Sequence, residues 1–121
     1  MSLFRKKVLA IVRQIPLGRV MTYASVAAAA ESKGAHRAVG TILKGNTEQE
    51  IPCHRVIRSD GAIGEYNGLQ GMKAELLRCE GVFISSRGFV KIKVYLVYEV
   101  ISYNKGKRGK SGANARNEER V

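Results

Sequence analysis

The chain has few of the residues that cross-link small proteins or bind metals. Among its 121 residues there are only two cysteines, Cys53 and Cys79, and two histidines. Two cysteines are more consistent with free thiols in a reducing compartment than with a disulfide. With so few sulfur and imidazole ligands, a structural zinc site has little support, and neither a metal nor a cofactor is expected.

Long uncharged apolar runs are also missing. No segment has the length to span a bilayer, and the basic residues near the amino terminus are not followed by the apolar stretch of a signal peptide. We therefore expect a cytoplasmic protein with no membrane contact. A chain of 121 residues has room for one modest domain with a small core, and a monomer is expected.

Acidic residues are scarce. Ten acidic side chains face 21 basic ones, which gives a formal net charge of +11 and a pI near 10.1. Six basic and two acidic residues lie in the last 18 positions, so +7 remains on residues 1–103. Such an excess indicates a polyanionic partner, most simply nucleic acid and hence the nucleoid, although a basic surface without that role remains an alternative.

The only two prolines mark boundaries. Apolar residues recur at helical spacing over residues 4–15, and Pro16 ends that pattern. Thr22 can cap a second helix over residues 23–30, and Lys33-Gly34 predicts a turn before a third helix over residues 35–43, which Gly45-Asn46 ends. Two short helices joined by a tight turn are typical of a helix-turn-helix, although any αα-hairpin looks similar.

The second half of the chain is less regular. A glycine-rich loop is expected over residues 59–71, and then an apolar helix in which Cys79 packs. The β-branched content of residues 89–101 favours a strand that pairs with the region 56–63. We predict a folded domain over residues 1–103 and a basic, disordered tail over residues 104–121.

The segment Ile51-Pro52-Cys53-His54-Arg55 places a thiol beside an imidazole and a guanidinium, just after a proline that restricts the backbone. A thiolate attacks and a thiol does not, so a reactive cysteine needs a base or a positive field nearby. A buried thiol next to a surface histidine is the equally weighted alternative from the residue types alone.

Several motifs in order decide between them. Pro-Cys-His-Arg-Val is preceded by His36-Arg37-Ala38-Val39-Gly40 and Lys44-Gly45-Asn46, and is followed by Gly61-Ala62-Ile63-Gly64-Glu65-Tyr66 and Lys73-Ala74-Glu75-Leu76-Leu77. From about residue 4 to residue 82 the chain resembles the carboxy-terminal active-site domain of O6-alkylguanine-DNA alkyltransferases. Most members of that family carry a further domain ahead of this one, whereas this chain starts almost directly at the first expected helix. The related alkyltransferase-like proteins carry tryptophan where Cys53 stands, and this chain contains no tryptophan.

The resemblance implies a mainly α fold with short β elements, namely a small, winged-helix-like helix-turn-helix domain. It implies a partner, double-stranded DNA that contains O6-alkylguanine, and transfer of the alkyl group to Cys53 in one irreversible turnover after the base is flipped. The implied catalytic residues are Cys53, His54, Glu80 and Tyr23. The implied DNA-binding residues are Arg37, Ala35, Ala38, Gly40 and Thr41, with Arg37 filling the gap that the flipped base leaves. The implied pocket residues are Val56, Tyr66, Asn67, Leu43 and Asn46.

Two departures from the family pattern bear on the substrate. Thr41 stands where the recognition helix commonly has glycine, and Leu69 stands where the pocket wall usually has a second glycine. Leu69 is expected to restrict bulky alkyl groups. Two other functions stay open: a noncatalytic module that recognises alkylated bases, and a cysteine hydrolase, for which no oxyanion hole is evident.

Overall fold

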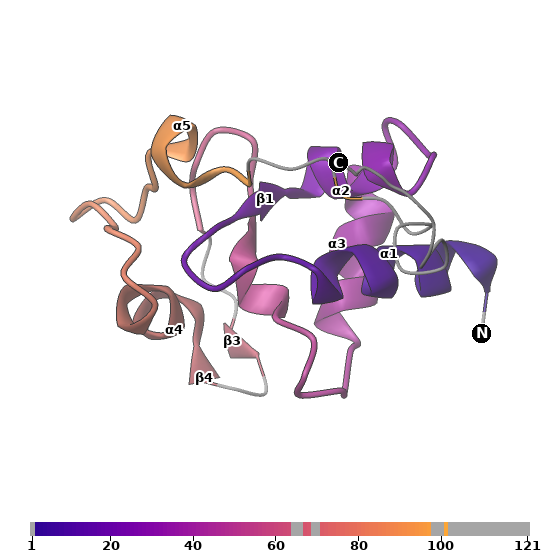
Figure 1. The fold of residues 1–121 in the computed structure, drawn as a ribbon, viewed down its shortest axis with the longest axis horizontal. Coiled ribbons are helices and arrows are strands. Elements are labelled where there is room, and N and C mark those ends of the chain that lie inside the picture. Colours follow the sequence, from indigo (N-terminus) through magenta and orange to yellow (C-terminus); the bar gives the residue numbers. More distant parts are fainter. Residues whose placement is uncertain (1, 64–66, 69–70, 98–100, 102–121) are drawn as a thin grey trace, which may run out of the picture.

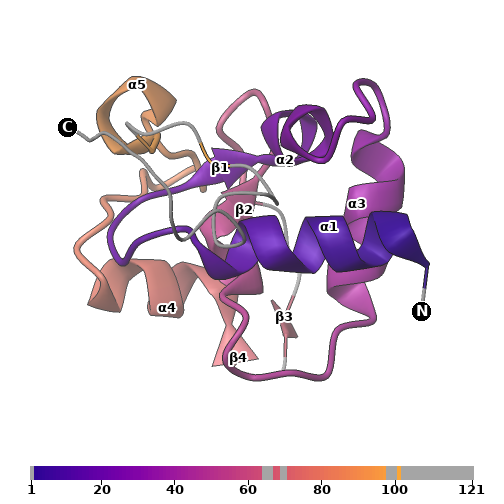
Figure 2. The same cartoon turned by 45° about the vertical axis from the view of Figure 1, so that its right-hand side comes forward.

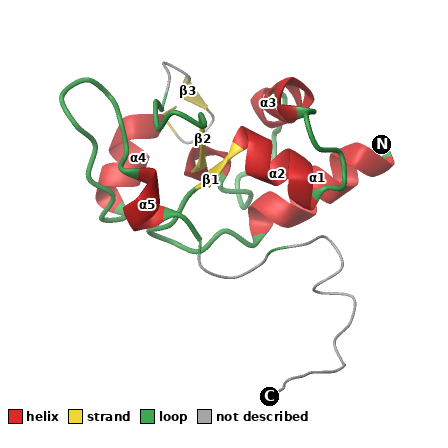
Figure 3. Ribbon diagram, turned by 90° about the horizontal axis from the view of Figure 1, so that it is seen from above, coloured by secondary structure: helices red, strands yellow, loops and turns green. Residues whose placement is uncertain are grey.

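The computed structural model describes residues 2–63, 67–68, 71–97 and 101. Figure 1 shows three helices at one end of the molecule: α1 (Leu3–Arg13), α2 (Tyr23–Ala29) and α3 (His36–Lys44). At the other end lie α4 (Lys73–Cys79) and the single turn α5 (Ile92–Tyr95), and Figure 3 shows the short strands between the two groups. The mainly helical prediction with short β elements is confirmed. None of the described helices has both the length and the apolar character needed to span a bilayer.

Helix α1 forms where the sequence predicts it. The Ser2 hydroxyl caps its first turn by accepting a hydrogen bond from the backbone N–H of Arg5 over 3.1 Å. Its apolar face packs into a first hydrophobic cluster, whose buried members from the three helices include Val8, Ile11 and Val12 of α1, Val26 of α2, and Val39 and Leu43 of α3. Figure 2 shows α1 crossing in front of α3, with α2 above it. The helix ends before Pro16, as expected.

Helices α2 and α3 form the helix-turn-helix. Thr22 caps α2 in a reciprocal capping box with Ser25, which confirms the predicted cap. The helix closes with paired hydrogen bonds from Ser32 N–H to Ala27 O and from Glu31 N–H to Ala28 O, both 2.9 Å long. Glu31 takes the left-handed conformation, with φ of 65°, that this ending requires. The turn then presents α3 with Val39 and Leu43 buried against the core.

Two pairs of short strands place the cysteine segment. Strand β1 (Met21–Thr22) runs directly into α2, and it pairs in parallel with β2 (Val56–Ile57), which follows the 3₁₀ turn η1 (Cys53–Arg55). Met21 lies opposite Val56, so the start of α2 is held beside the cysteine turn. Strands β3 (Asn67–Gly68) and β4 (Gly71–Met72) pair antiparallel within the stretch that was expected to be a loop.

The predicted strand over residues 89–101 is wrong for most of its described part. Phe89 and Leu96 each form one isolated bridge, to Ala62 and Val20, and α5 lies between them. Ile92 and Tyr95, one helical turn apart, pack against a second hydrophobic cluster, so burial at a spacing of three residues outweighs β propensity here. The buried members of this cluster are Val20, Ile57, Ile63, Leu77, Val82, Ile84 and Val90. Residues 98–100 lie outside the described part.

Cys79 is also placed differently from its prediction. It ends α4 with an exposed side chain and does not pack in the core, whereas Leu77 on the same helix is fully buried. The predicted tail over residues 104–121 lies outside the described residues, so its state stays a prediction.

Candidate active site

Cys53 is the first residue of η1 and is nearly buried, with 7% of its surface exposed. Pro52 precedes it with φ of −79°, and the Cys53 N–H donates to Ile51 O over 2.8 Å, so the backbone on both sides is held. The side-chain amide of Asn46 donates a hydrogen bond to Cys53 Sγ over 3.3 Å. The sulfur therefore has a defined position and a polar partner.

Burial raises the pKa of the Cys53 thiol, because a low-dielectric surrounding disfavours the thiolate. The hydrogen bond from Asn46 and the positive charge of Lys73 act in the opposite direction without cancelling the effect of burial. The resting group is thus a protonated thiol, and a reaction at sulfur needs a base to remove its proton.

A base stands next in the chain. His54 Nε2 lies 2.7 Å from Glu80 Oε2, and both side chains are largely buried. Burial alone raises the pKa of Glu80, but hydrogen bonds from Arg55 and His54 outweigh it and leave the pKa below the usual value. Glu80 is therefore an ionised acceptor, so the proton of this contact resides on His54 Nε2.

The other ring nitrogen has a different environment. His54 Nδ1 is buried and has no hydrogen-bond partner among the described residues. Since Nε2 carries the proton, Nδ1 holds the free electron pair and is the basic atom of the ring. The imidazole next to Cys53 is thereby set in the tautomer that a general base needs.

Arg55 holds Glu80 in place. Its guanidinium donates to Oε1 through Nε over 2.9 Å and to Oε2 through Nη2 over 2.8 Å, which is a bidentate ion pair. Its Nη1 also donates to Ile15 O over 2.7 Å, just beyond the end of α1. Arg55 therefore connects the cysteine turn, α4 and α1.

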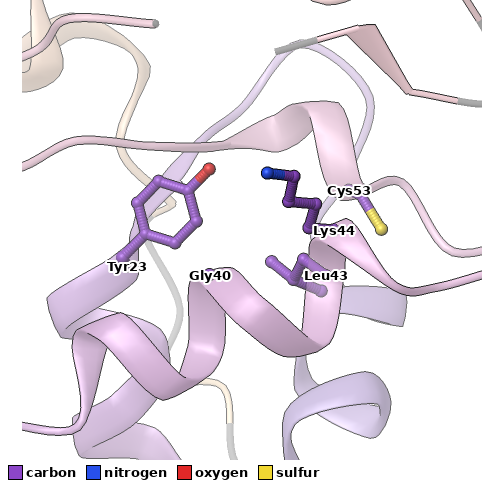
Figure 4. A pocket seen from close by; sticks show the side chains of 5 residues that line it. All are labelled: Tyr23, Gly40, Leu43, Lys44 and Cys53. Carbon is purple, nitrogen blue, oxygen red and sulfur yellow. The ribbon is translucent and has the colours of Figure 1, made fainter.

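A pocket of about 320 Å³ opens beside Cys53. Its described lining residues are Tyr23, Gly40, Leu43, Lys44 and Cys53, which Figure 4 shows. The volume is at the lower end of the range for small-ligand sites, a size suited to a single planar group such as a nucleobase. A Cβ at Gly40 would lie 3.9 Å from the Tyr23 ring, which is an ordinary van der Waals contact, so the bare backbone of α3 faces the ring here.

Lys73 is buried behind Tyr23. Its ammonium donates to the Tyr23 hydroxyl over 3.2 Å and lies 5.4 Å from the ring centroid, and only 3% of the residue is exposed. Burial lowers the pKa of Lys73 to about 8, while a thiolate at Cys53 acts to raise it. Because Lys73 donates to the phenol oxygen, the hydroxyl proton of Tyr23 is free to point toward another acceptor.

Helix α3 presents a surface of small side chains together with one arginine. Arg37, Ala38 and Thr41 are exposed, while Ala35 and Gly40 are half-buried. The Thr41 hydroxyl donates to Arg37 O over 3.2 Å, so this polar group is satisfied within the helix. The surface opposite the core can therefore approach another molecule closely.

The remaining predicted pocket residues are placed as follows. Leu43 lines the pocket, Val56 is fully buried in β2, and Asn46 lies behind the sulfur. Asn67 lies in β3, where only the backbone is described, and Tyr66 and Leu69 lie outside the described residues.

Three residues were not predicted as site residues. Arg55 was expected only as a positive field beside Cys53, whereas Lys73 and Lys44 were quoted only as parts of motifs. The position of Arg55 directly after His54 is a signal in the sequence, but nothing local predicts that Lys73 is buried 50 positions from the tyrosine that it contacts.

Comparison with known proteins identifies related chains. The family described as "6-O-methylguanine DNA methyltransferase, DNA binding domain" matches residues 3–82. The match is thus to a DNA-binding domain over the amino-terminal two thirds of this chain, which corrects the expectation of a carboxy-terminal active-site domain. The methylated-DNA–protein-cysteine methyltransferase of Methanothermobacter thermautotrophicus is 40% identical over 69% of this chain and 47% of its own length. The chain spans about half the length of the curated relatives that it matches, or less.

Solved structures show the same fold. S. pombe Atl1, in complex with damaged DNA containing O6-carboxymethylguanine, is similar with a TM-score of 0.70 and 30% identity over 82% of this chain and 98% of Atl1. Mycobacterium tuberculosis OGT in complex with DNA is similar with a TM-score of 0.59 and 33% identity, over 66% of this chain and 50% of OGT.

Proposed function

This chain belongs to the 6-O-methylguanine DNA methyltransferase family of DNA-repair proteins, and on that premise we propose that it transfers an alkyl group from O6 of guanine in duplex DNA to its own Cys53. The observation that carries the proposal is that hydrogen bonds join Arg55, Glu80 and His54, next to the nearly buried thiol of Cys53, which lines a pocket. The set contains a nucleophile, a base and a group that orients the base.

The proton path follows from the tautomer. Ionised Glu80 keeps the proton of the imidazole on His54 Nε2, and Nδ1 accepts the thiol proton of Cys53 through a water molecule. The His54–Glu80–Arg55 contacts then stabilise the imidazolium that forms. The resulting thiolate keeps its hydrogen bond from Asn46.

The transfer itself is a displacement at carbon. The bond between Sγ and the alkyl carbon forms as the bond between that carbon and O6 breaks, and the electron pair goes to the guanine. Tyr23 donates its hydroxyl proton to the leaving base, and Lys73, hydrogen-bonded to the Tyr23 oxygen, stabilises the phenolate. A thioether resists hydrolysis, and the described lining residues of the pocket offer no group that would cleave it, so each molecule reacts once.

The helix-turn-helix supplies the access to DNA. The lesion lies inside the base stack, so the nucleotide must leave the stack before sulfur can reach it. We propose that α3 enters the minor groove, with Ala35, Ala38, Gly40 and Thr41 against its walls, and that Arg37 fills the gap in the stack. The net charge of +11 and the DNA complexes of the two structural relatives support this assignment.

Transfer is tested with duplex DNA that bears one O6-methylguanine, by locating the added methyl group with peptide mass spectrometry. We expect one methyl group on Cys53, none in Cys53→Ala, and full transfer in Cys79→Ser, in which the exposed second thiol is removed. Methylation of Cys79 alone, or repeated release of product, contradicts the proposal.

A second candidate is a module that recognises alkylated bases without transfer. The raised pKa of Cys53 favours it, because a protonated thiol does not attack. The similarity to S. pombe Atl1 over 98% of that chain also favours it, because Atl1 is seen bound to damaged DNA. Tight binding to the lesion duplex with an unmodified Cys53 would establish it.

A further inference from the structure

Lys44, the last residue of α3, lines the same pocket as Cys53 and Tyr23. Figure 4 shows its side chain turned back over the pocket, with the ammonium nitrogen directed toward the Tyr23 hydroxyl. No acidic side chain lies within 4.0 Å of this ammonium in the described part of the chain, whereas Lys7, Arg13, Arg55 and Arg58 each have such a partner.

The described part of the pocket wall adds no negative charge. Its other described lining residues are a tyrosine, a glycine, a leucine and the thiol, and buried Lys73 lies behind the tyrosine. Two ammonium groups therefore act on this space, and Glu80 is already bound by Arg55 and His54. A neutral methyl adduct makes no use of this excess of positive charge.

We propose that this pocket favours O6-alkyl groups that end in a carboxylate, and that Lys44 is the residue that determines this preference. The inference rests on the proposed function, since it concerns the same site. In an O6-carboxymethyl group the carbon that sulfur attacks is bonded directly to the carboxylate. Placing that carbon at Cys53 therefore brings the negative charge into the pocket that Lys44 lines.

Transfer from this adduct balances as it does for methyl. The Sγ–CH₂ bond forms, the CH₂–O6 bond breaks and the electron pair goes to guanine, which takes a proton from Tyr23. The thiol proton goes to His54, and the product is S-carboxymethyl-Cys53. A carboxylate that leaves water for a partly enclosed site needs a cation there, and Lys44 supplies it.

A backbone phosphate is the other anion that Lys44 could contact. A phosphate contact strengthens binding to every adduct equally, whereas a carboxylate contact strengthens binding only to the adduct that carries the carboxylate. The decisive quantity is therefore a ratio between two adducts of equal size and different charge, namely O6-carboxymethylguanine and O6-carbamoylmethylguanine.

We would measure single-turnover transfer from duplexes bearing methyl, carboxymethyl or carbamoylmethyl adducts, with wild-type protein, Lys44→Met and Lys93→Met. Lys93 is exposed on α5, so its removal changes the net charge equally without touching the pocket. The ratio of carboxymethyl to carbamoylmethyl rates should fall roughly three- to tenfold in Lys44→Met and stay unchanged in Lys93→Met.

Three results overturn the inference: an unchanged ratio in Lys44→Met, an equal fall in Lys93→Met, or equal slowing on all three adducts. If the wild-type protein accepts no methyl group, that result contradicts the proposed function but does not bear on the preference for a carboxylate. Fluorescence anisotropy with the nonreacting Cys53→Ala protein, with and without Lys44→Met, measures the same ratio in binding.

Discussion

Asn46, the second residue after α3, and Cys53 are joined by a hydrogen bond from the side-chain amide of Asn46 to Sγ, 3.3 Å long. The same amide nitrogen donates to Glu48 O over 2.9 Å, and the amide oxygen accepts from Glu48 N–H over 3.1 Å. With 6% of Asn46 exposed, these contacts are shielded from water. One side chain thus connects the end of the helix proposed to enter DNA with the proposed nucleophile.

We predict that Asn46→Ala raises the pKa of Cys53 further, because the hydrogen bond that favours the thiolate is lost. The free energy of unfolding should fall by about 2 kcal/mol, since two other hydrogen bonds disappear with it. The pH dependence of Cys53 alkylation by iodoacetamide, measured in a Cys79→Ser background, tests the first effect. An unchanged profile would show that the Asn46 contact does not act on the thiol.

Glu80→Gln should remove the ion pair with Arg55 and the negative charge that fixes the His54 tautomer, because the amide keeps only one acceptor oxygen and also presents an N–H donor. We expect the free energy of unfolding at pH 7 to fall by about 2 kcal/mol and methyl transfer to slow strongly. The pKa of Glu80 is lowered on folding, so its stabilisation is complete above its usual value of 4.5 and is lost as the pH falls through the folded value. The difference from wild type should therefore shrink in acid.

Urea unfolding between pH 3 and pH 7 measures this difference, with Glu75→Gln, an exposed glutamate on α4 just ahead of Glu80, as the control. A constant difference across this pH range would contradict the assignment of an ionised, paired Glu80.

Lys73→Met tests the buried cation. The unfolded chain keeps the lysine proton up to about pH 10.5, whereas the folded protein releases it near pH 8, so the lysine's contribution to stability rises between these values. The stability of the wild type relative to Lys73→Met should therefore rise by about 3 kcal/mol over this window. Lys91→Met, which removes an exposed lysine, should show no such trend. A flat difference for Lys73→Met would mean that Lys73 is solvated.

The turn at Gly61 should tolerate no side chain. Its φ is +91°, and a Cβ would lie 2.6 Å from the carbonyl oxygen of Val90, whose N–H donates to Gly61 O. We expect Gly61→Ala to cost about 3 kcal/mol in urea unfolding. Gly88→Ala, at φ of +84° with nothing within 4 Å, should cost only about 1 kcal/mol. Equal costs would show that the close approach to Val90 relaxes freely.

The sequence predicted what depends on neighbouring residues. Pro16 bounds α1, the Thr22 cap begins α2, and Pro52-Cys53-His54 marks the proposed nucleophile, because capping, proline geometry and a reactive motif act over a few positions. The expected strand near residue 92 failed for the same reason, since β propensity is local and the burial of Ile92 and Tyr95 against the second cluster is not.

Only the tertiary structure decided the electrostatics of the site. Arg55 meets Glu80 across 25 positions, and Lys73 meets Tyr23 across 50. Burial of Cys53 raises the pKa of its thiol, and burial of Lys73 lowers the pKa of its ammonium. The pairing of β1 with β2 brings the start of α2 and the cysteine turn together and so assembles the pocket. Residue types supplied the chemical groups, but desolvation and the distances between charges depend on how the chain folds back on itself.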